Sequence, residues 1–268
     1  MGRKIKKYLR IIAALQKNNL MSMMAYKQNF VIMTMAVIIF MAMNIIFLQV
    51  IFGYIQNIAG WNFYEVLLII GSTMIIEGLL WIFGARVGAL GHLIRNGELD
   101  GLLAKPADSQ FLISFWECDH EDFPRVIIGI ILICYGLANL NLDLETVLAN
   151  LFFYLILLIN AIVITYSITL LLKTIYFWTI ADYSLYNFLN AMSQISQYPT
   201  DVFVNFFVKS IFTFIIPLAF AATVPAKILA RGFDWKLVVG SCTVATVFFY
   251  LSRRFWQYAL KHYTSASS

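Results

Sequence analysis

The chain has 268 residues, of which 61% are hydrophobic and only 12% are charged, and its mean hydropathy is +0.80. A soluble domain carries about 25% charged residues, so this composition excludes an ordinary soluble enzyme and indicates a membrane protein. The net charge of +5 is small. The sequence contains no G-x-x-x-x-G-K-[ST], HExxH or Ser-His-Asp pattern, which argues against a chain that hydrolyses nucleotides or peptides itself.

The first 27 residues predict an interfacial amphipathic helix. At about 100° per residue, apolar side chains from Ile5 to Leu15 share one face and basic side chains from Arg3 to Lys17 share the opposite face. Such a helix lies on a membrane surface with its cations at anionic headgroups. The alternative is a disordered basic tail, and we do not expect a cleaved signal peptide. Seven basic residues precede position 28: Arg3, Lys4, Lys6, Lys7, Arg10, Lys17 and Lys27.

Six long apolar runs predict six transmembrane helices in an all-α polytopic fold. Most are long enough to cross a hydrocarbon core of about 30 Å, and helices satisfy the backbone groups that lipid cannot. The segment 174–205 is aromatic and only moderately apolar, so we interpret it as an extension of the fourth span followed by an interfacial segment. The six runs are 29–52, 63–84, 124–140, 146–172, 206–223 and 237–252.

The distribution of basic residues predicts that both termini are cytoplasmic. Loops 53–62 and 141–145 then lie outside and contain no Lys or Arg, as the positive-inside rule requires. A seventh span within 174–205 would move Arg253 and Arg254 outside, which is why none is predicted there. Three basic residues are exceptions on the outer side: Lys227, Arg231 and Lys236.

The largest cytoplasmic feature is predicted at 85–123. Within it, one face of a short helix is formed by Leu90, Leu93, Ile94 and Gly97. Pro106 then requires an extended exit, because the residue before a proline avoids the helical region. A surface helix held between two spans can bind in a groove of a soluble partner and pass motion into those spans. The alternative is an ordinary solvated loop.

The run from Cys118 to Asp122 contains residue types that bind metals. Adjacent residues on a helix cannot all reach one ion, so we interpret this run as a solvated acidic face. The three cysteines also lack the paired spacing of a zinc site. No metal or other cofactor is therefore expected on this chain.

Glu77 is the only acidic residue well inside a predicted span. A charge there costs about 2.5–3.5 kcal/mol on insertion scales. We favour a position that faces a translocation pathway or a seam with a second subunit. The alternatives are a helix-end carboxylate reached by water and a pair with a polar neighbour inside the bundle. Asn44 and Asn160 are further candidates for the pathway or seam, although hydrogen bonding between helices is the simpler role.

The segment 217–235 is predicted to re-enter the outer leaflet and to close the outer end of a pathway. Pro217 interrupts the fifth span, and Pro225 can start a new short helix. Lys227 and Arg231 are four residues apart, so they share a helical face that we expect to point to water.

Four stretches carry a resemblance to a known family. They are Gly97-Glu98-Leu99-Asp100 with Leu102, Leu103, Lys105 and Pro106; Tyr198-Pro199; Ile215-Ile216-Pro217-Leu218-Ala219-Phe220 with Val224-Pro225-Ala226; and His262-Tyr263-Thr264-Ser265. Together with the order of the apolar runs, they resemble the ABC-2 type permeases of bacteria, six-span proteins usually encoded in pairs with one ATPase. The resemblance extends over nearly the whole chain, and 108–122 departs from the family pattern.

The resemblance implies a single transmembrane domain over 1–268, an N-terminal connecting helix, a coupling helix at about 88–104 and an outer re-entrant segment at 217–235. It implies that ATP and Mg bind to two copies of a separate ATPase, and that a second permease, identical or homologous, completes the pathway in the bacterial plasma membrane. The lipids of that membrane are further partners, and no nucleic acid is expected. The implied ATPase contacts are Gly97, Glu98, Leu99, Asp100, Leu102, Lys105 and Pro106, and the implied outer gate is Pro217, Pro225, Lys227 and Arg231.

An ATP-driven export permease is thus the leading hypothesis, and two alternatives remain. A membrane scaffold without transport activity would not need the charged loop helix. A channel or secondary transporter is expected to place more polar residues inside its spans and often to show inverted repeats. The family's substrates range over drugs, lipids, peptides and polysaccharides, so the resemblance does not specify the transported molecule.

Overall fold

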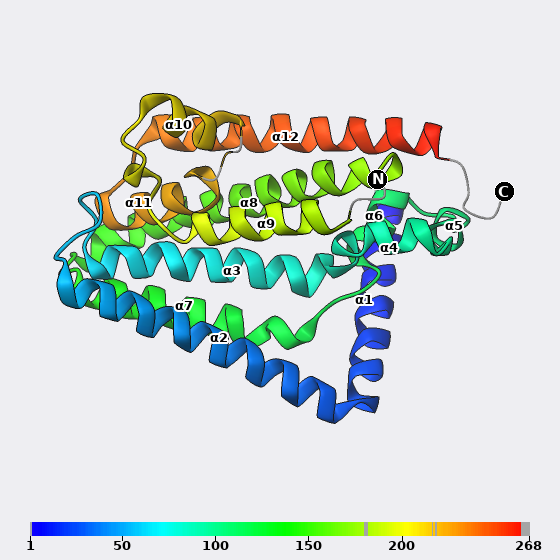
Figure 1. Ribbon diagram of the computed structural model, residues 1–268, viewed down its shortest axis with the longest axis horizontal. Coiled ribbons are helices and arrows are strands. Elements are labelled where there is room, and N and C mark those ends of the chain that lie inside the picture. The colour runs from blue at the N-terminus through cyan, green and yellow to red at the C-terminus, as the bar shows by residue number, and fades with distance from the viewer. Residues whose placement is uncertain (1, 180–181, 216, 218, 264–268) are drawn as a thin grey trace.

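The computed structural model describes residues 2–263 apart from 180, 181, 216 and 218, and all its regular elements in that part are helices. The long helices run along a common direction, and short helices gather at the two ends of this bundle (Figure 1). The long helices are α2 (Lys27–Tyr54), α3 (Phe63–Gly88), α7 (Phe123–Asn139), α8 (Leu144–Thr174), α9 (Asp182–Ser196) and α12 (Trp235–His262).

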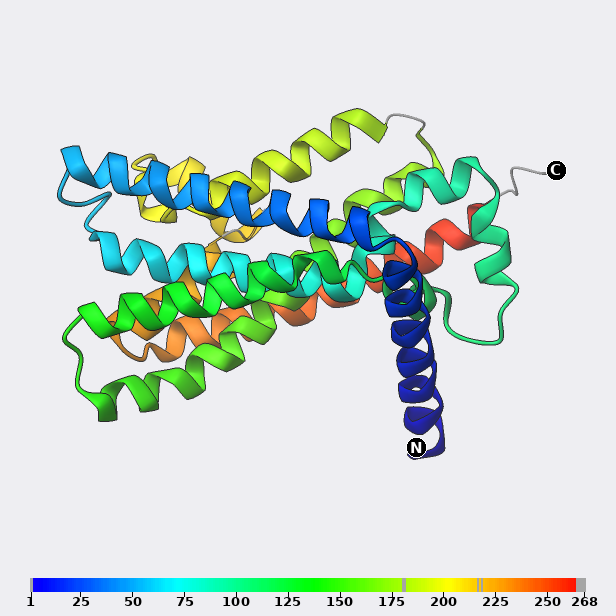
Figure 2. The same cartoon turned by 90° about the horizontal axis from the view of Figure 1, so that it is seen from below.

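Short helical elements lie at both ends of the bundle, which we call the α4 end and the α11 end. Helix α1 crosses the α4 end at a steep angle to the bundle, and Figure 2 shows it extending away from the long helices. The short elements at the α4 end are α4 (Leu90–Arg95), α5 (Glu98–Leu103), α6 (Ser109–Phe115) and η1 (His120–Asp122). Those at the α11 end are η3 (Thr200–Val202), α10 (Phe206–Ser210), the π-helical turns η4 (Ile211–Ile215) and η5 (Ala219–Thr223), and α11 (Val224–Arg231).

The predicted N-terminal helix is present as α1 (Gly2–Ala25). Its Tyr8 ring meets the Phe111 ring edge-on at 4.5 Å, and Gln16 Nε2 donates to Cys118 Sγ at 2.8 Å. Helix α1 therefore contacts α6 and the loop after α6, so it is attached to the rest of the fold. Its position on a membrane surface stays a prediction.

Four helices in the described part are long and apolar enough to cross a membrane. They are α2, the 63–84 part of α3, α8 with its one-turn extension η2 (Ile175–Phe177), and α12. They match the first, second, fourth and sixth predicted spans. The third predicted span is α7, whose 17 residues make it shorter than these four.

The fifth predicted span, 206–223, is not one continuous helix. It is divided among α10, η4 and η5, with Pro217 outside any helix. Pro217 lacks an N–H group and its ring clashes with the preceding turn, so the interruption has a local cause. Helix α9, with 15 residues, lies beside α3 and α8 along part of the bundle (Figure 1). The extension of the fourth span is present as η2, and the interfacial position expected for the following segment stays a prediction.

Two contacts mark the course of α9. Ser193 Oγ donates to Glu77 in α3, and just after α9 Asp201 Oδ2 accepts a bond from Trp61 Nε1 at the α11 end, at 3.0 Å. The described helices do not decide the number of passes, so the six spans stay a prediction. Arg253 bonds Asp108 and therefore lies at the same end as α1.

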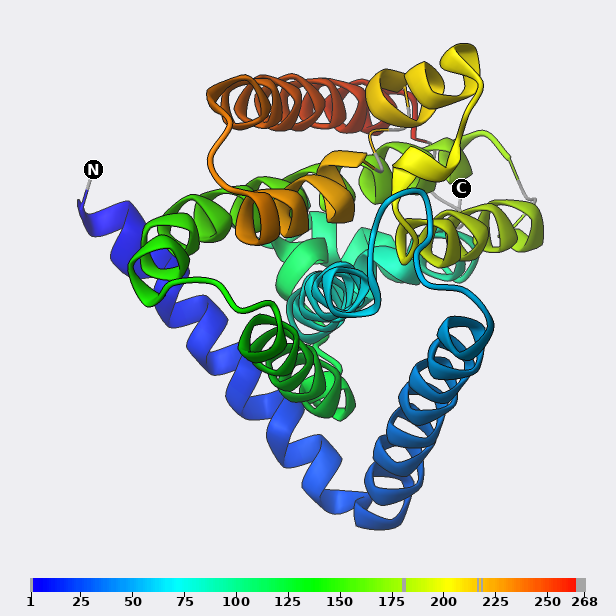
Figure 3. The same ribbon diagram turned by 90° about the vertical axis from the view of Figure 1, so that its left-hand side faces the viewer.

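Helix α3 occupies the centre of the bundle, which Figure 3 shows end-on. Glycines let α7 approach it closely. A Cβ atom added to Gly71 would lie 2.7 Å from the carbonyl oxygen of Gly129, and one added to Gly129 would lie 2.7 Å from that of Gly71. Small residues at such a crossing allow backbones to touch, which is a common way for membrane helices to associate.

Side-chain caps start several helices. Asn62 and Glu65 form a reciprocal capping box at α3, each side chain accepting from the other's backbone N–H at 2.9 Å. Asp108 accepts from Phe111 N at the start of α6. Pro225 stands in the first turn of α11, and Gly232 ends that helix with φ +97°, as expected of Gly after a helix.

Candidate functional site

The surface helix predicted at about 88–104 is two helices rather than one. Gly97 separates α4 from α5, and its φ of +71° is a conformation that suits glycine. It therefore forms a corner and does not lie on a helical face with Leu90 and Leu93 as predicted. Together, α4, α5 and α6 form a unit of residues 90–115 that we call the α4–α6 platform.

The implied ATPase-contact residues fall into two groups on this platform. Leu99 and Leu102 are 1% and 4% exposed and pack in a cluster with Leu93 and with Trp256 of α12. Glu98 is exposed and lies 4.0 Å from His92 Nδ1. The two leucines are thus covered inside the fold and hold the platform in place, whereas Glu98 lies on its surface.

The remaining residues of this set are Lys105 and Pro106, in the loop between α5 and α6, and Asp100 in α5. The Lys105 ammonium stands over the Trp116 ring, 4.7 Å from its centroid. The Pro106 carbonyl oxygen accepts a hydrogen bond from Lys7 Nζ at 2.9 Å. Asp100 is half-buried in the first turn of α5. The platform is therefore braced from one side by α1.

A polar network that sequence reasoning missed ties the platform to the long helices. Arg253 of α12 forms an ion pair with Asp108 and donates to Gln110 Oε1 at 2.9 Å. Tyr166 of α8 accepts from Gln110 Nε2 at 3.1 Å and bonds Ser114 Oγ at 2.7 Å. Burial favours the neutral form of Asp108, but the bonds from Arg253 and from Phe111 N outweigh it and lower the pKa of this carboxyl.

The Cys118–Asp122 run is not the solvated acidic face that we predicted. Cys118, His120 and Asp122 are buried, because η1 packs against α2 and α3. Burial, followed by the charges of Asp122 and Glu117, raises the pKa of Asp119 to about 6. Burial also lowers the pKa of His120, which favours the neutral ring.

Glu77 lies in an ion network inside the bundle. Arg125 Nη1 of α7 donates to Glu77 Oε2 at 2.8 Å, and Arg125 Nε donates to Asp122 Oδ1 at 2.6 Å. Ser193 of α9 donates to the second oxygen of Glu77. This is the intramolecular pairing that the sequence left open as an alternative to a pathway position, and it joins α3, α7 and α9.

The two asparagines behave differently. Asn160 Nδ2 of α8 lies 3.2 Å from Cys242 Sγ of α12, so it is a contact between helices. Asn44 Nδ2 donates to the Phe40 carbonyl oxygen of its own helix at 2.9 Å, and among the described residues it forms no bond to another helix. Neither contact identifies a pathway.

The predicted outer-gate residues lie at the α11 end. Pro217 and Pro225 are buried, and Lys227 is half-buried. Arg231 does not simply point to water: Nε donates to Glu65 Oε1 at 2.8 Å, and the guanidinium lies 4.2 Å from the centroid of the Trp61 ring. The capping carboxylate of α3 therefore also holds the end of α11.

Helix α9 presents polar side chains that sequence reasoning also missed. Asn187, Asn190 and Gln194 are exposed, and their spacing of three and four residues puts them on one face. Ser193 and Met192 face the bundle instead, through Glu77 and a buried cluster with Phe220. The helical spacing of these amides could have been read from the sequence. The same amides lower the apolarity of the segment, and the prediction of spans relied on apolarity.

Comparison with known proteins gives one family. A family model described as ABC-2 family transporter protein matches residues 38–267, which is most of the chain. No curated protein and no solved structure gives a significant match. The matched range begins within α2 and includes the platform, α9 and the α11 end, and it excludes α1.

Proposed function

The chain belongs to the ABC-2 family of transporter proteins, and from this premise we propose that it is the permease subunit of an ATP-driven exporter. In this proposal, two copies of a separate ATPase subunit bind ATP and Mg, and a second permease, identical or homologous, forms the other half of the pathway. The α4 end faces the cytoplasm of a bacterial cell with both termini, and the α11 end faces outward.

One observation carries the proposal: the α4–α6 platform is attached to two long helices by paired polar groups. Asp108 and Gln110 bond Arg253 of α12, and Gln110 also bonds Tyr166 of α8. The leucine cluster beneath α5 leaves little room for independent movement. A force applied to the platform by a partner would therefore move α8 and α12. An ordinary solvated loop would not need such an attachment.

This proposal is tested by reversing the platform's surface charge. Glu98→Lys with Asp100→Lys should reduce capture of the co-expressed ATPase, or leave it bound without stimulated hydrolysis. Asp143→Lys is the matched control, because Asp143 is exposed at the opposite end, just before α8. Normal capture together with normal stimulated hydrolysis in the double variant would contradict the assignment and favour a scaffold.

Within the same proposal, the exposed amides of α9 line the pathway or the seam with the second permease. Amide side chains directed at lipid lack hydrogen-bond partners, so a face of three is better placed against water or protein. In a variant without native cysteines, Asn190→Cys should react with a water-soluble thiol reagent. Ile159→Cys on α8, where the native side chain is 61% exposed, is the control for a lipid-facing site. Equal, slow labelling of both cysteines would place the α9 face in lipid.

The outer-gate role of 217–235 belongs to the same proposal. Its support is the contact of α11 with α3 and α8, and the attachment of Arg231 to Glu65 and Trp61. A segment held on the central helix at this end is suited to closing a pathway between two permeases.

A further inference from the structure

The corner between α1 and α2 contains a pocket that the permease proposal does not use. Only Tyr26 separates the two helices, and its φ of −114° and ψ of 53° are not helical, so α2 leaves the direction of α1 (Figure 3). The pocket has a volume of about 420 Å³, and its lining residues are Ser22, Met23, Tyr26, Asn29, Phe30 and Glu121. We propose that this elbow pocket binds an organic cation with an apolar body.

Three helical elements surround the elbow pocket. Ser22 and Met23 belong to the last turn of α1. Asn29 and Phe30 belong to the first turn of α2. Glu121 comes from η1, which contacts α2, and it is half-buried. The pocket therefore lies where two helices meet at a corner and a third element approaches them.

The polar side chains of the elbow pocket are available to a ligand. Among the described residues, the side chains of Ser22, Asn29 and Glu121 form no hydrogen bond or ion pair. Tyr26 is 72% exposed, and in the same part of the chain no cation or other ring stacks on it. The pocket thus offers a carboxylate, a carboxamide, a hydroxyl group and an aromatic face that the fold itself does not use.

The charge around the elbow pocket favours a cation. Residues 117–122 include four acids and no lysine or arginine, and the neighbouring Arg125 already binds two other carboxylates. Burial, followed by the charges of Asp119 and Asp122, raises the pKa of the Glu121 carboxyl. A cation beside Glu121 would reduce the cost of keeping this carboxylate charged.

The lining suits an organic cation better than a metal ion. Ca²⁺ and Mg²⁺ take several oxygen ligands at close range, and Glu121 is the only carboxylate among the described lining residues. The rings of Tyr26 and Phe30 can instead face an organic cation, as aromatic side chains do in sites for quaternary ammonium groups. Met23 adds an adaptable apolar contact. The pocket volume also lies within the range of about 300–1,000 Å³ that small-molecule sites occupy.

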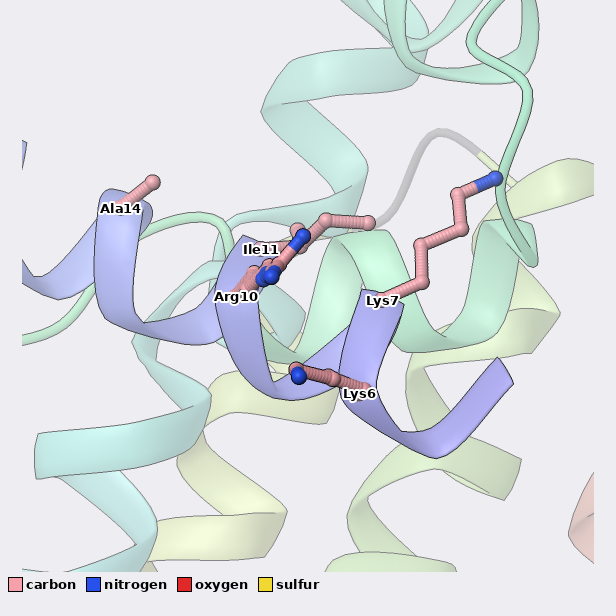
Figure 4. A pocket seen from close by; sticks show the side chains of 5 residues that line it. All are labelled: Lys6, Lys7, Arg10, Ile11 and Ala14. Atoms are coloured by element: carbon pink, nitrogen blue, oxygen red, sulfur yellow. The ribbon is translucent and has the colours of Figure 1, made fainter. Parts of the chain in front are cut away.

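A second hollow on α1 has the opposite charge. Lys6, Lys7 and Arg10 contribute to its lining, and all its lining residues belong to α1 (Figure 4). Arg10 precedes Ser22 by twelve residues, which is about 18 Å along a helix and exceeds the Debye length of about 8–10 Å in dilute salt. Neutralising Lys6 and Arg10 should therefore leave the binding of an organic cation at the elbow pocket unchanged.

The test is equilibrium dialysis of the purified full-length protein in a maltoside detergent against radiolabelled tetraphenylphosphonium. We expect saturable binding to wild type. Glu121→Gln should weaken it about tenfold, because the cation loses its charged partner. Tyr26→Leu should weaken it about threefold, whereas Tyr26→Phe keeps the ring and should bind as wild type does. Glu145→Gln is the matched control, because it removes the same charge at an exposed position at the start of α8.

Two results would overturn this proposal. Unchanged binding in both Glu121→Gln and Tyr26→Leu would show that the elbow pocket is not the site. Displacement of the probe by millimolar magnesium chloride, but not by sodium chloride of equal ionic strength, would assign the pocket to an inorganic cation.

A competition experiment identifies the source of the cation. If phosphatidylethanolamine displaces the probe and diacylglycerol does not, the ammonium group of a lipid is the natural ligand. If neither displaces it, the ligand is a free organic cation, and both results keep the site. None of these measurements requires ATPase or transport, so the permease proposal can fail independently.

Discussion

Helices α2 and α3 follow each other in the sequence and are both apolar enough to cross a membrane, yet they occupy opposite environments. In the most apolar window of each helix, 72% of the residues are buried in α3 and 11% in α2. Figure 3 shows α3 surrounded by other helices and α2 set to one side. Apolarity therefore predicts that a helix crosses the membrane but does not predict its place in the bundle.

The difference lies in small and polar residues. Helix α3 contains Gly71 and Gly78, where an added Cβ would collide with α7, and it contains Glu77 and Ser72, which bond α7, α9 and α8. Gly53 of α2 would meet nothing within 4 Å, and α2 exposes a long series of large apolar side chains. Helices in lipid associate where their backbones can touch or where polar groups need partners, and α3 satisfies both conditions.

The largest loss of stability is expected from removing the positive charge of Arg125, which lies beside the central helix α3. Arg125→Leu leaves Glu77 and Asp122 without their shared partner, with their side chains 17% and 11% exposed. Loss of one member of a buried pair costs about 3–5 kcal/mol, so the variant should unfold at much lower temperature or denaturant concentration in detergent. Arg254→Leu is the control, because the Arg254 bond to Tyr250 is exposed. Equal stability of the two variants would mean that the network does not hold α3 in place.

Replacing a glycine by alanine should have a smaller effect on stability, with one sign at the α3–α7 contact and the opposite sign in α2. Gly129→Ala puts a Cβ against the Gly71 carbonyl oxygen and forces α3 and α7 apart, at a cost of about 1–3 kcal/mol. Gly53→Ala in α2 meets no atom and should stabilise the protein by about 0.5–1 kcal/mol, because alanine loses less backbone freedom. Thermal unfolding of both variants in the same detergent measures the contrast. If both changes have the same sign, close α3–α7 packing is not what distinguishes the two helices.

Sequence reasoning succeeded where local chemistry decides the structure. Apolar runs of sufficient length located α2, α3, α8 and α12, while Pro225 indicated the start of α11. It did not predict the contacts of α9 with α3 and α8, because exposed amides at Asn187, Asn190 and Gln194 reduce the apolarity of this helix. The fifth predicted span, 206–223, is interrupted at Pro217.

The missed parts of the candidate site have a different cause. Asp108 and Arg253 are 145 residues apart, and Gln110 and Tyr166 are 56 apart. No periodicity within one segment can reveal such pairs, since they arise from how the helices pack. The same applies to Glu77 and Arg125, and to Arg231, whose local spacing suggested a solvated face while packing put it beside Glu65 and Trp61.

An effect that depends on pH is expected at Asp119, in the loop before α7 beside α2 and α3. The backbone N–H of Asp119 donates to the Trp81 carbonyl oxygen of α3 at 3.2 Å, and the adjoining η1 contacts both α2 and α3. The pKa of Asp119 is about 6 in the folded protein, against 3.8 ordinarily, so between these values the folded state binds more protons than the unfolded state. The free energy of unfolding due to this group therefore falls as pH rises from about 4 to about 6, and stays lower above that.

Asp119→Asn should remove this contribution, because an amide need not become charged in a partly buried position. The variant should gain stability relative to wild type as pH rises through the same interval, and the gain should be constant above about 6. Thermal unfolding across this pH range measures the difference between the two proteins, which cancels the titration of the other acids. Asp143→Asn, at an exposed position, should retain the wild-type pH profile. If the pH profile of Asp119→Asn ran parallel to that of wild type, burial of Asp119 beside α2 and α3 would not contribute to the pH dependence of stability.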